Sequence, residues 1–172
     1  VLNYGSKCAY IATAEILDEE MAERVKQHQL RRNGKRWVNF EAPYNADNTV
    51  AQAGEAADCI LFDCLTLYLS NLMYGKNAPD TFEEKCLYVR NEVDKLLQAA
   101  KKTNKTVVFV SNDVGCGLVP VNQLAREYRD VAGWLNQQLG FEADFVFYVM
   151  AGQAVDIKKL AFKFENNPTL GE

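Results

Sequence analysis

The sequence predicts a doubly wound α/β domain with a mainly parallel sheet, because short apolar runs alternate with longer segments of helical character. Nearly continuous apolar runs are typical of parallel strands, which are covered on both faces. Such runs occur in CAYIATA (8–14), DCILFD (58–63) and TVVFVSN (106–112). A fourth, DFVFYVMAG (144–152), predicts another buried strand. In folds of this class ligands bind beyond the carboxyl ends of the strands, so the loops after these runs are the candidates for chemistry.

The first strand is followed by a segment of helical character. We expect a helix from about Asp18 to Arg31, in which Asp18 acts as the cap and two glutamates occupy the first turn. The next segment, RWVNFEAPYNADN, is predicted to be irregular apart from a short strand at 37–40. Beyond the second apolar run, LTLYLSNLMYG predicts a helix that ends at Gly75.

Two longer helices are expected further along the chain. Residues 81–103 have an amphipathic pattern, and 123–139 form the last predicted helix. The side chains expected to face the core from the first of these are Phe82, Leu87, Val93 and Leu97. With no repeat or convincing boundary, residues 1–172 are interpreted as a single domain.

The composition excludes several classes of protein. At 172 residues, 48% hydrophobic and 24% charged, the chain has the make-up of an ordinary globular domain. A net charge of −4 argues against a nucleic-acid-coating surface. No apolar run approaches the ~20 residues needed to span a bilayer, and no signal-peptide pattern opens the chain. Five cysteines without a CxxC pair, beside one histidine, predict reduced thiols of a cytoplasmic protein, with Cys116 exposed between two glycines.

Asp63 ends an apolar strand in the manner of a Walker B motif. Such a carboxylate can hold Mg²⁺ or accept a proton beside a phosphate, although many buried strands also end in Asp at a turn. The partner motif GxxxxGK[ST] is absent from the 172 residues. The absence either argues against nucleotide chemistry or indicates a missing segment. Because the chain opens on Val and VLNYGSK reads as the tail of a helix, we expect an N-terminal strand and P-loop to be missing from this chain.

His28 is the single histidine, and its neighbours allow two interpretations. It continues an apolar helical stripe with Met21 and Val25, which favours a packed core residue. Arginines at positions 24, 31 and 32 would share its helical face, and guanidinium groups suit phosphate oxygens. A neutral imidazole among arginines is what phosphoryl or nucleotidyl transfer to nitrogen requires. The residues alone leave both interpretations open.

The loop SNDVGCGLVP places Asn112 and Asp113 after a strand, where Asp113 contacts a substrate or metal or instead makes an Asx turn. Downstream, Arg129 lies on the last predicted helix. It could reach a phosphate, but its spacing alone favours an ion pair with an acid across an interface.

Four segments in chain order together resemble one family. They are YIATAEILDEEMAERVKQHQ, LFDCLTLYLSNL, VSNDVGCGLVP and LAREYRDVAGWLNQ. The chain is similar from about Cys8 to Lys158 to the bifunctional adenosylcobinamide kinase/adenosylcobinamide-phosphate guanylyltransferases of cobalamin biosynthesis. The resemblance implies a P-loop NTPase-type fold and a homotrimer. It also implies phosphorylation of adenosylcobinamide by ATP or GTP, followed by transfer of GMP from GTP through a guanylyl-histidine to give adenosylcobinamide-GDP.

The resemblance also implies residue roles. His28 would take the GMP, and Asp63 would hold Mg²⁺ or assist the hydroxyl nucleophile. The nucleotide-binding positions that it implies are Ala12, Thr13, Ala14, Gln29, Leu30, Arg31, Arg32, Glu41 and Asp63. Departures from the family pattern are the absent P-loop, Asp113 in place of Glu and Cys116 in place of Met. The alternatives are a single-activity kinase or guanylyltransferase, or a non-catalytic nucleotide-binding relative.

Overall fold

The computed structural model describes residues 1, 3, 5–15, 19, 23, 26 and 36–162. The chain divides into two compact units, Val1–Leu135 and Asn136–Glu172. The helix expected at 18–31 lies largely outside the described residues, and His28 lies outside them altogether.

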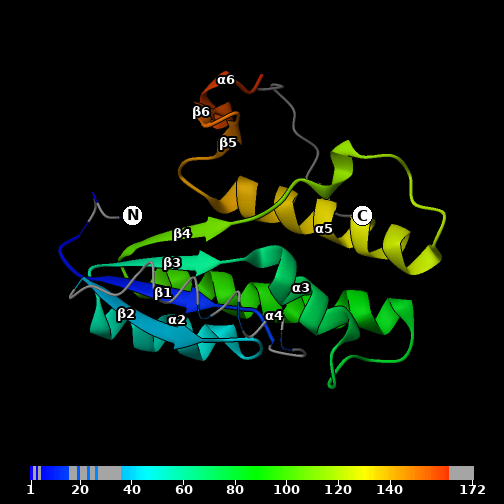
Figure 1. Ribbon diagram of the computed structural model, residues 1–172, viewed down its shortest axis with the longest axis horizontal. Helices are drawn as coiled ribbons and strands as arrows, with labels where there is room; N and C mark the ends of the chain where they lie inside the picture. Colours follow the sequence, from blue (N-terminus) through cyan, green and yellow to red (C-terminus); the bar gives the residue numbers. More distant parts are fainter. Residues whose placement is uncertain are drawn as a thin grey trace. The chain divides into compact units, whose positions relative to one another are not determined.

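The first unit contains a four-stranded parallel sheet in the order β2-β1-β3-β4 (Figure 1). Its strands are β1 (Cys8–Ala12), β2 (Trp37–Glu41), β3 (Cys59–Asp63) and β4 (Thr106–Val110). The three strands expected in 8–14, 58–63 and 106–112 are thus confirmed, as is the short strand near 37–40. β1 and β3 are the inner strands and the most deeply buried, whereas β4 lies at an edge and is only half-buried.

Helices cover the sheet. Figure 1 shows α2 and α4 on one face, where α2 packs against β1, β2 and β3, and α4 packs against α2 and α3. The bounds of the longer helices are α2 Ala46–Ala56, α3 Leu65–Tyr74, α4 Phe82–Lys102 and α5 Gln123–Glu142. The expected helices at 65–75, 81–103 and 123–139 are confirmed, and Gly75 is the C-cap of α3 as predicted. Among the described residues, no helix combines the length and the apolar character that crossing a membrane would require.

α2 corrects the prediction of irregular structure after β2. Its inward face consists of Ala46, Val50 and Ala53, all completely buried. Small side chains at this spacing pack closely against the sheet, but they give only a weak amphipathic signal in the sequence. The helix was therefore overlooked although its periodicity is regular.

α4 begins with a capping box but turns a different face inward from the one expected. The Thr81 hydroxyl accepts from the Glu84 amide at 3.3 Å, and the Glu84 carboxylate accepts from the Thr81 amide. Phe82 and Leu87 are 38% and 62% exposed, so their predicted place in the core was wrong, whereas that of Val93 is confirmed. The buried positions are Val89, Glu92, Val93 and Leu96, which recur at helical spacing.

The second unit holds a β-hairpin rather than another strand of the parallel sheet. β5 (Phe147–Met150) pairs antiparallel with β6 (Gln153–Asp156) and, among the described residues, with no other strand. The turn residues Ala151 and Gly152 have φ angles of 51° and 77°, the left-handed geometry of a tight hairpin. All four residues of β5 are exposed, so the prediction of a buried strand at 144–152 was wrong.

The short helix α6 (Ile157–Leu160) follows the hairpin, and its Lys158 binds the end of α5. The ammonium group donates to the carbonyls of Gly140 at 3.1 Å and Phe141 at 2.9 Å, and also to that of Ala143. A cation at this place satisfies the last carbonyls of a helix and complements its dipole.

Candidate active site

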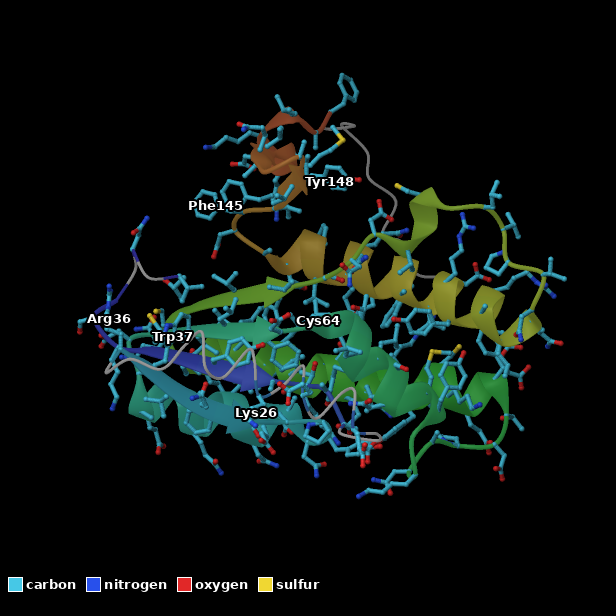
Figure 2. The ribbon with its side chains drawn as sticks, in the orientation of Figure 1. Lys26, Arg36, Trp37, Cys64, Phe145 and Tyr148 are labelled. Atoms are coloured by element: carbon cyan, nitrogen blue, oxygen red, sulfur yellow. The ribbon has the colours of Figure 1, made fainter. Side chains whose placement is uncertain are left out.

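Three predicted site residues meet at the carboxyl edge of the sheet. In the parallel register Ala12 stands opposite Glu41 on one side and Asp63 on the other. Residues in register on parallel strands point to the same face, and neighbouring strands lie about 4.8 Å apart. The carboxylate side chains of Glu41 and Asp63 therefore flank the methyl side chain of Ala12 on one face of the sheet. Figure 2 marks this end of the sheet by Cys64, and Trp37 marks the opposite end.

Thr13 is completely buried, and its polar atoms are used within the protein. Its hydroxyl accepts from the Cys64 amide and donates to the Cys64 carbonyl, both at 2.8 Å. Its amide donates to the Asp63 carbonyl at 3.1 Å, and its carbonyl accepts from the Asn71 side chain at 2.7 Å. Thr13 thus ties the end of β1 to the β3–α3 junction and shapes the edge through internal bonds.

Asp63 is half-buried at the end of β3 and is held from one side. The hydroxyl of Tyr10, a buried residue of β1, donates to Asp63 Oδ2 at 2.7 Å. The Tyr10 ring is in turn fixed edge-on against Trp37, with centroids 6.3 Å apart. Among the described residues Oδ1 has no hydrogen-bond partner, so the carboxylate presents one oriented oxygen for a ligand.

A single oriented carboxylate suits one kind of metal site. Within the described residues, no group of three or more His, Cys, Asp and Glu side chains is placed to hold a metal ion. Mg²⁺ does not need such a cage, because it commonly binds through one or two carboxylates together with substrate phosphates and water. The arrangement at Asp63 therefore fits Mg²⁺ that arrives with a phosphorylated ligand.

A second set of polar contacts connects the ends of β3 and β4. Thr66 lies in the first turn of α3, and its hydroxyl is 3.1 Å from the Cys64 sulfur. The same hydroxyl oxygen accepts a hydrogen bond from the side-chain amide of Asn112 at 3.0 Å. The Tyr128 hydroxyl from α5 donates to the Thr66 carbonyl at 2.9 Å, and burial raises the pKa of Tyr128 to about 12. Tyr128 therefore stays protonated at physiological pH, as this donated bond requires.

The glycine-rich loop after β4 is stabilised by hydrogen bonds within the loop and by one hydrogen bond from α5. Asp113 Oδ1 accepts from the Gly115 amide and Oδ2 from the Cys116 thiol, both at 3.1 Å, so the Asx-turn interpretation fits. Arg129 donates to the Gly115 carbonyl. Within this chain no acid among the described residues pairs with Arg129, and the ion pair across an interface that its spacing favoured stays a prediction. Cys116 is exposed and all five cysteines are free, as expected.

The structure places only part of the predicted site. It brings Ala12–Ala14, Glu41 and Asp63 together, whereas His28 and its neighbours Gln29, Leu30, Arg31 and Arg32 lie outside the described residues. Sequence reasoning overlooked Tyr10 and Asn71, which position the edge. Their contacts join residues 53 and 58 positions apart, so no local pattern signals them.

The chain was compared with known proteins. A profile of the family described as cobinamide kinase / cobinamide phosphate guanyltransferase matches residues 1–157. The chain therefore belongs to the cobinamide kinase / cobinamide phosphate guanyltransferase family. The match confirms the predicted family, and the parallel α/β sheet agrees with the P-loop NTPase-type fold that the resemblance implied.

Three curated relatives show how closely the chain follows this family. The bifunctional adenosylcobalamin biosynthesis protein CobU of Salmonella typhimurium is 37% identical over 154 residues, covering 87% of this chain and 84% of the relative. CobU of Escherichia coli is 35% identical over 159 residues, covering 90% and 87%. CobP of Pseudomonas aeruginosa, which bears the same bifunctional description, is 34% identical over 154 residues, covering 90% and 84%. The family match contains the whole parallel sheet and the hairpin.

Proposed function

We propose that this protein is a bifunctional enzyme of cobalamin biosynthesis. In the first reaction it phosphorylates adenosylcobinamide with ATP or GTP, and in the second it transfers GMP from GTP to that phosphate, giving adenosylcobinamide-GDP. The observation that carries this proposal is the family match over 1–157, together with three relatives that are named as bifunctional proteins. A protein with either activity alone, or with nucleotide binding alone, remains the alternative to be tested.

The second reaction is proposed to pass through His28. A neutral imidazole nitrogen attacks the α-phosphorus of GTP, a P–N bond forms, and the P–O bond to pyrophosphate breaks. A phosphate oxygen of adenosylcobinamide phosphate then attacks the same phosphorus, and the P–N bond breaks to release the histidine. Two displacements replace one, and Arg31 and Arg32, three and four residues after His28 in the sequence, are proposed to spread charge on the phosphate oxygens.

The carboxyl edge of the sheet is proposed to hold the nucleotide. Ala12, Thr13 and Ala14 would approach it through backbone, because the Thr13 hydroxyl is already bound to Cys64. Glu41 and Asp63 would supply the polar contacts, and Asp63 Oδ1 is the atom available for Mg²⁺. When bound, Mg²⁺ would neutralise charge on the phosphate groups.

The remaining proposals concern assembly and place in the cell. We infer a homotrimer from the family resemblance. We infer a cytoplasmic location from the free thiols of the five cysteines. Sedimentation equilibrium of the purified protein tests the trimer directly.

The deciding experiment follows label from GTP onto the protein. The protein as its gene encodes it, together with a His28→Asn variant, is incubated with α-labelled GTP and Mg²⁺ and then denatured. We expect an acid-labile, alkali-stable label on the parent and none on the variant. Label on both would place the linkage elsewhere, and label on neither, with GTP bound, would favour a kinase or a binding protein. Assays with adenosylcobinamide and with its phosphate then test each half of the function separately.

A further inference from the structure

One guanidinium group near the carboxyl edge of the sheet is only partly satisfied. Arg129 of α5 donates from Nη2 to the Gly115 carbonyl. Its Nη1 is shielded from solvent and has no hydrogen-bond partner in the part of the chain that the structure describes. Buried polar groups in native proteins are almost always paired, so a buried N–H of this kind indicates that a ligand completes the site.

The chemistry of the group defines that ligand as an anion. A guanidinium stays protonated at every physiological pH, and its planar fork matches the oxygens of phosphate. The nearest acid along the loop, Asp113, is engaged with the Gly115 amide and the Cys116 thiol instead. The positive charge of Arg129 is therefore not neutralised by an ion pair within the described residues.

Arg129 is bonded to a different loop from those that carry the predicted nucleotide residues within the described part of the chain. Gly115 belongs to the loop after β4, whereas Ala12, Glu41 and Asp63 end β1, β2 and β3. Those three positions carry two carboxylates and no cation. In a transferase that joins two phosphorylated molecules, a cationic side chain is one of the groups that can bind the acceptor phosphate.

We propose that Arg129 is the binding residue for the acceptor phosphate, with Nη1 donating to an oxygen of the phosphate monoester on the corrinoid. The bond to Gly115 holds one arm of the guanidinium still, so the free arm is oriented before the ligand arrives. The identity of the acceptor rests on the proposed function. The proposal that Arg129 binds phosphate does not rest on the proposed function, because it is argued from the bond at Nη2 and the unpaired donor at Nη1.

A neighbouring arginine on the same helix provides a matched control. Arg126 Nη1 donates to the carbonyls of Pro120 at 3.0 Å and Val121 at 2.6 Å, and its side chain is exposed. Arg126→Gln removes a positive charge and two contacts to the same loop without removing the buried donor. Arg129→Gln removes the buried donor as well, and Arg129→Lys keeps the charge but loses the fork.

The first arm of the test measures binding of inorganic phosphate, using ¹⁵N-arginine-labelled protein and side-chain NMR. In the parent protein we expect the Arg129 resonances to shift as phosphate is added. We expect affinity to fall by at least about tenfold in Arg129→Gln and by less than about twofold in Arg126→Gln. Unmoved Arg129 resonances in the parent would overturn the proposal without reference to any variant, and so would equal losses in the two variants.

The second arm distinguishes the source of the phosphate. In steady-state guanylyltransfer we expect Arg129→Gln to raise the KM for adenosylcobinamide phosphate, to leave the KM for GTP unchanged, and to be partly rescued by Arg129→Lys. A raised KM for GTP instead would assign Arg129 to the nucleotide and overturn the acceptor assignment. Phosphate binding at Arg129 in a protein without transferase activity would refute the proposed function while the anion site stands.

Discussion

Replacing Thr13 with valine removes the hydroxyl group that joins the ends of β1 and β3. The two side chains have nearly the same shape, so the substitution removes hydrogen bonds and leaves the volume almost unchanged. The hydroxyl accepts from the Cys64 amide and donates to the Cys64 carbonyl, each at 2.8 Å, and Thr13 is 0% exposed. The perturbation therefore acts on two buried backbone groups of one residue.

The expected loss of stability depends on which hydrogen-bond partners the Cys64 carbonyl and amide still have after the substitution. The Cys64 carbonyl still accepts from the Tyr68 amide at 3.1 Å, so the lost bond there costs about 1 kcal/mol. The Cys64 amide loses its partner inside the protein, and an unpaired buried donor costs about 1–3 kcal/mol. Thr13→Val should therefore lower the free energy of unfolding by about 2–4 kcal/mol.

The measurement is urea unfolding followed by circular dichroism, with Thr13→Ser as the control. Serine keeps the hydroxyl and loses one methyl group, which costs about 0.5–1.5 kcal/mol in a packed site. We expect the unfolding midpoint to fall further for valine than for serine, with an unchanged slope. A valine variant at least as stable as the serine variant would refute the view that the hydroxyl, rather than the packing of Thr13, secures this edge.

Three further predictions concern single groups. Tyr10→Phe removes the donor to Asp63 and should cost about 1–2 kcal/mol in the same unfolding assay; a loss below about 0.5 kcal/mol would show that the bond contributes nothing. Burial raises the pKa of the Cys59 thiol to about 11, so a thiol reagent at pH 8 should modify the exposed Cys116 first; a fast phase that survives in Cys116→Ser would contradict this. The hydrogen bonds of the capping box lower the pKa of Glu84 from 4.5, so its carboxylate stabilises the fold above that pH and this stability is lost as pH falls through the folded value. Glu84→Ala should thus be less stable than the parent at pH 7, with a gap that narrows in acid, and a constant gap from pH 7 to pH 3 would count against the linkage.

The parallel sheet was predictable because its strands carry an almost continuous apolar signal. The same apolar signal led to a wrong prediction of a buried strand at 144–152, where the run forms one strand of an exposed hairpin. Its partner, Gln153–Asp156, has four residues and only two apolar side chains, so it gave no strand pattern of its own. Apolar character indicates extended structure, whereas the pairing partner is decided by turn geometry such as that of Ala151 and Gly152.

The inward face of α4 shows a different kind of error. The apolar residues Phe82 and Leu87 lie toward the outside, and the buried face includes Glu92, which pairs with Lys95 at 2.7 Å. A charged residue can occupy a buried position when it has such a partner, so hydropathy alone does not identify the buried stripe. The start of the helix, in contrast, was predicted at residue 81, where Thr81 and Glu84, three residues apart, form the capping box.

The candidate site was predictable as residues but not as geometry. The strand-end pattern proposed Asp63 and the family resemblance proposed Glu41, while their placement on either side of Ala12 depends on the strand order, which no single strand specifies. The contact from Tyr10 to Asp63 depends on the same order. Candidate site residues can thus be proposed one by one, whereas the bonds that orient them follow from the register of the sheet.

The internal bonding of the edge limits which groups can serve a ligand. Thr13 has its hydroxyl, amide and carbonyl engaged, and Asp113 has both carboxylate oxygens engaged. Two groups that remain available are Oδ1 of Asp63, which is negative and lies on β3, and Nη1 of Arg129, which is positive and lies on α5. Because a metal-bound nucleotide needs the first and a phosphate acceptor the second, the two halves of the proposed transfer are divided between β3 and α5. A change at either group should therefore affect one substrate and spare the other, which a shared binding site would not allow.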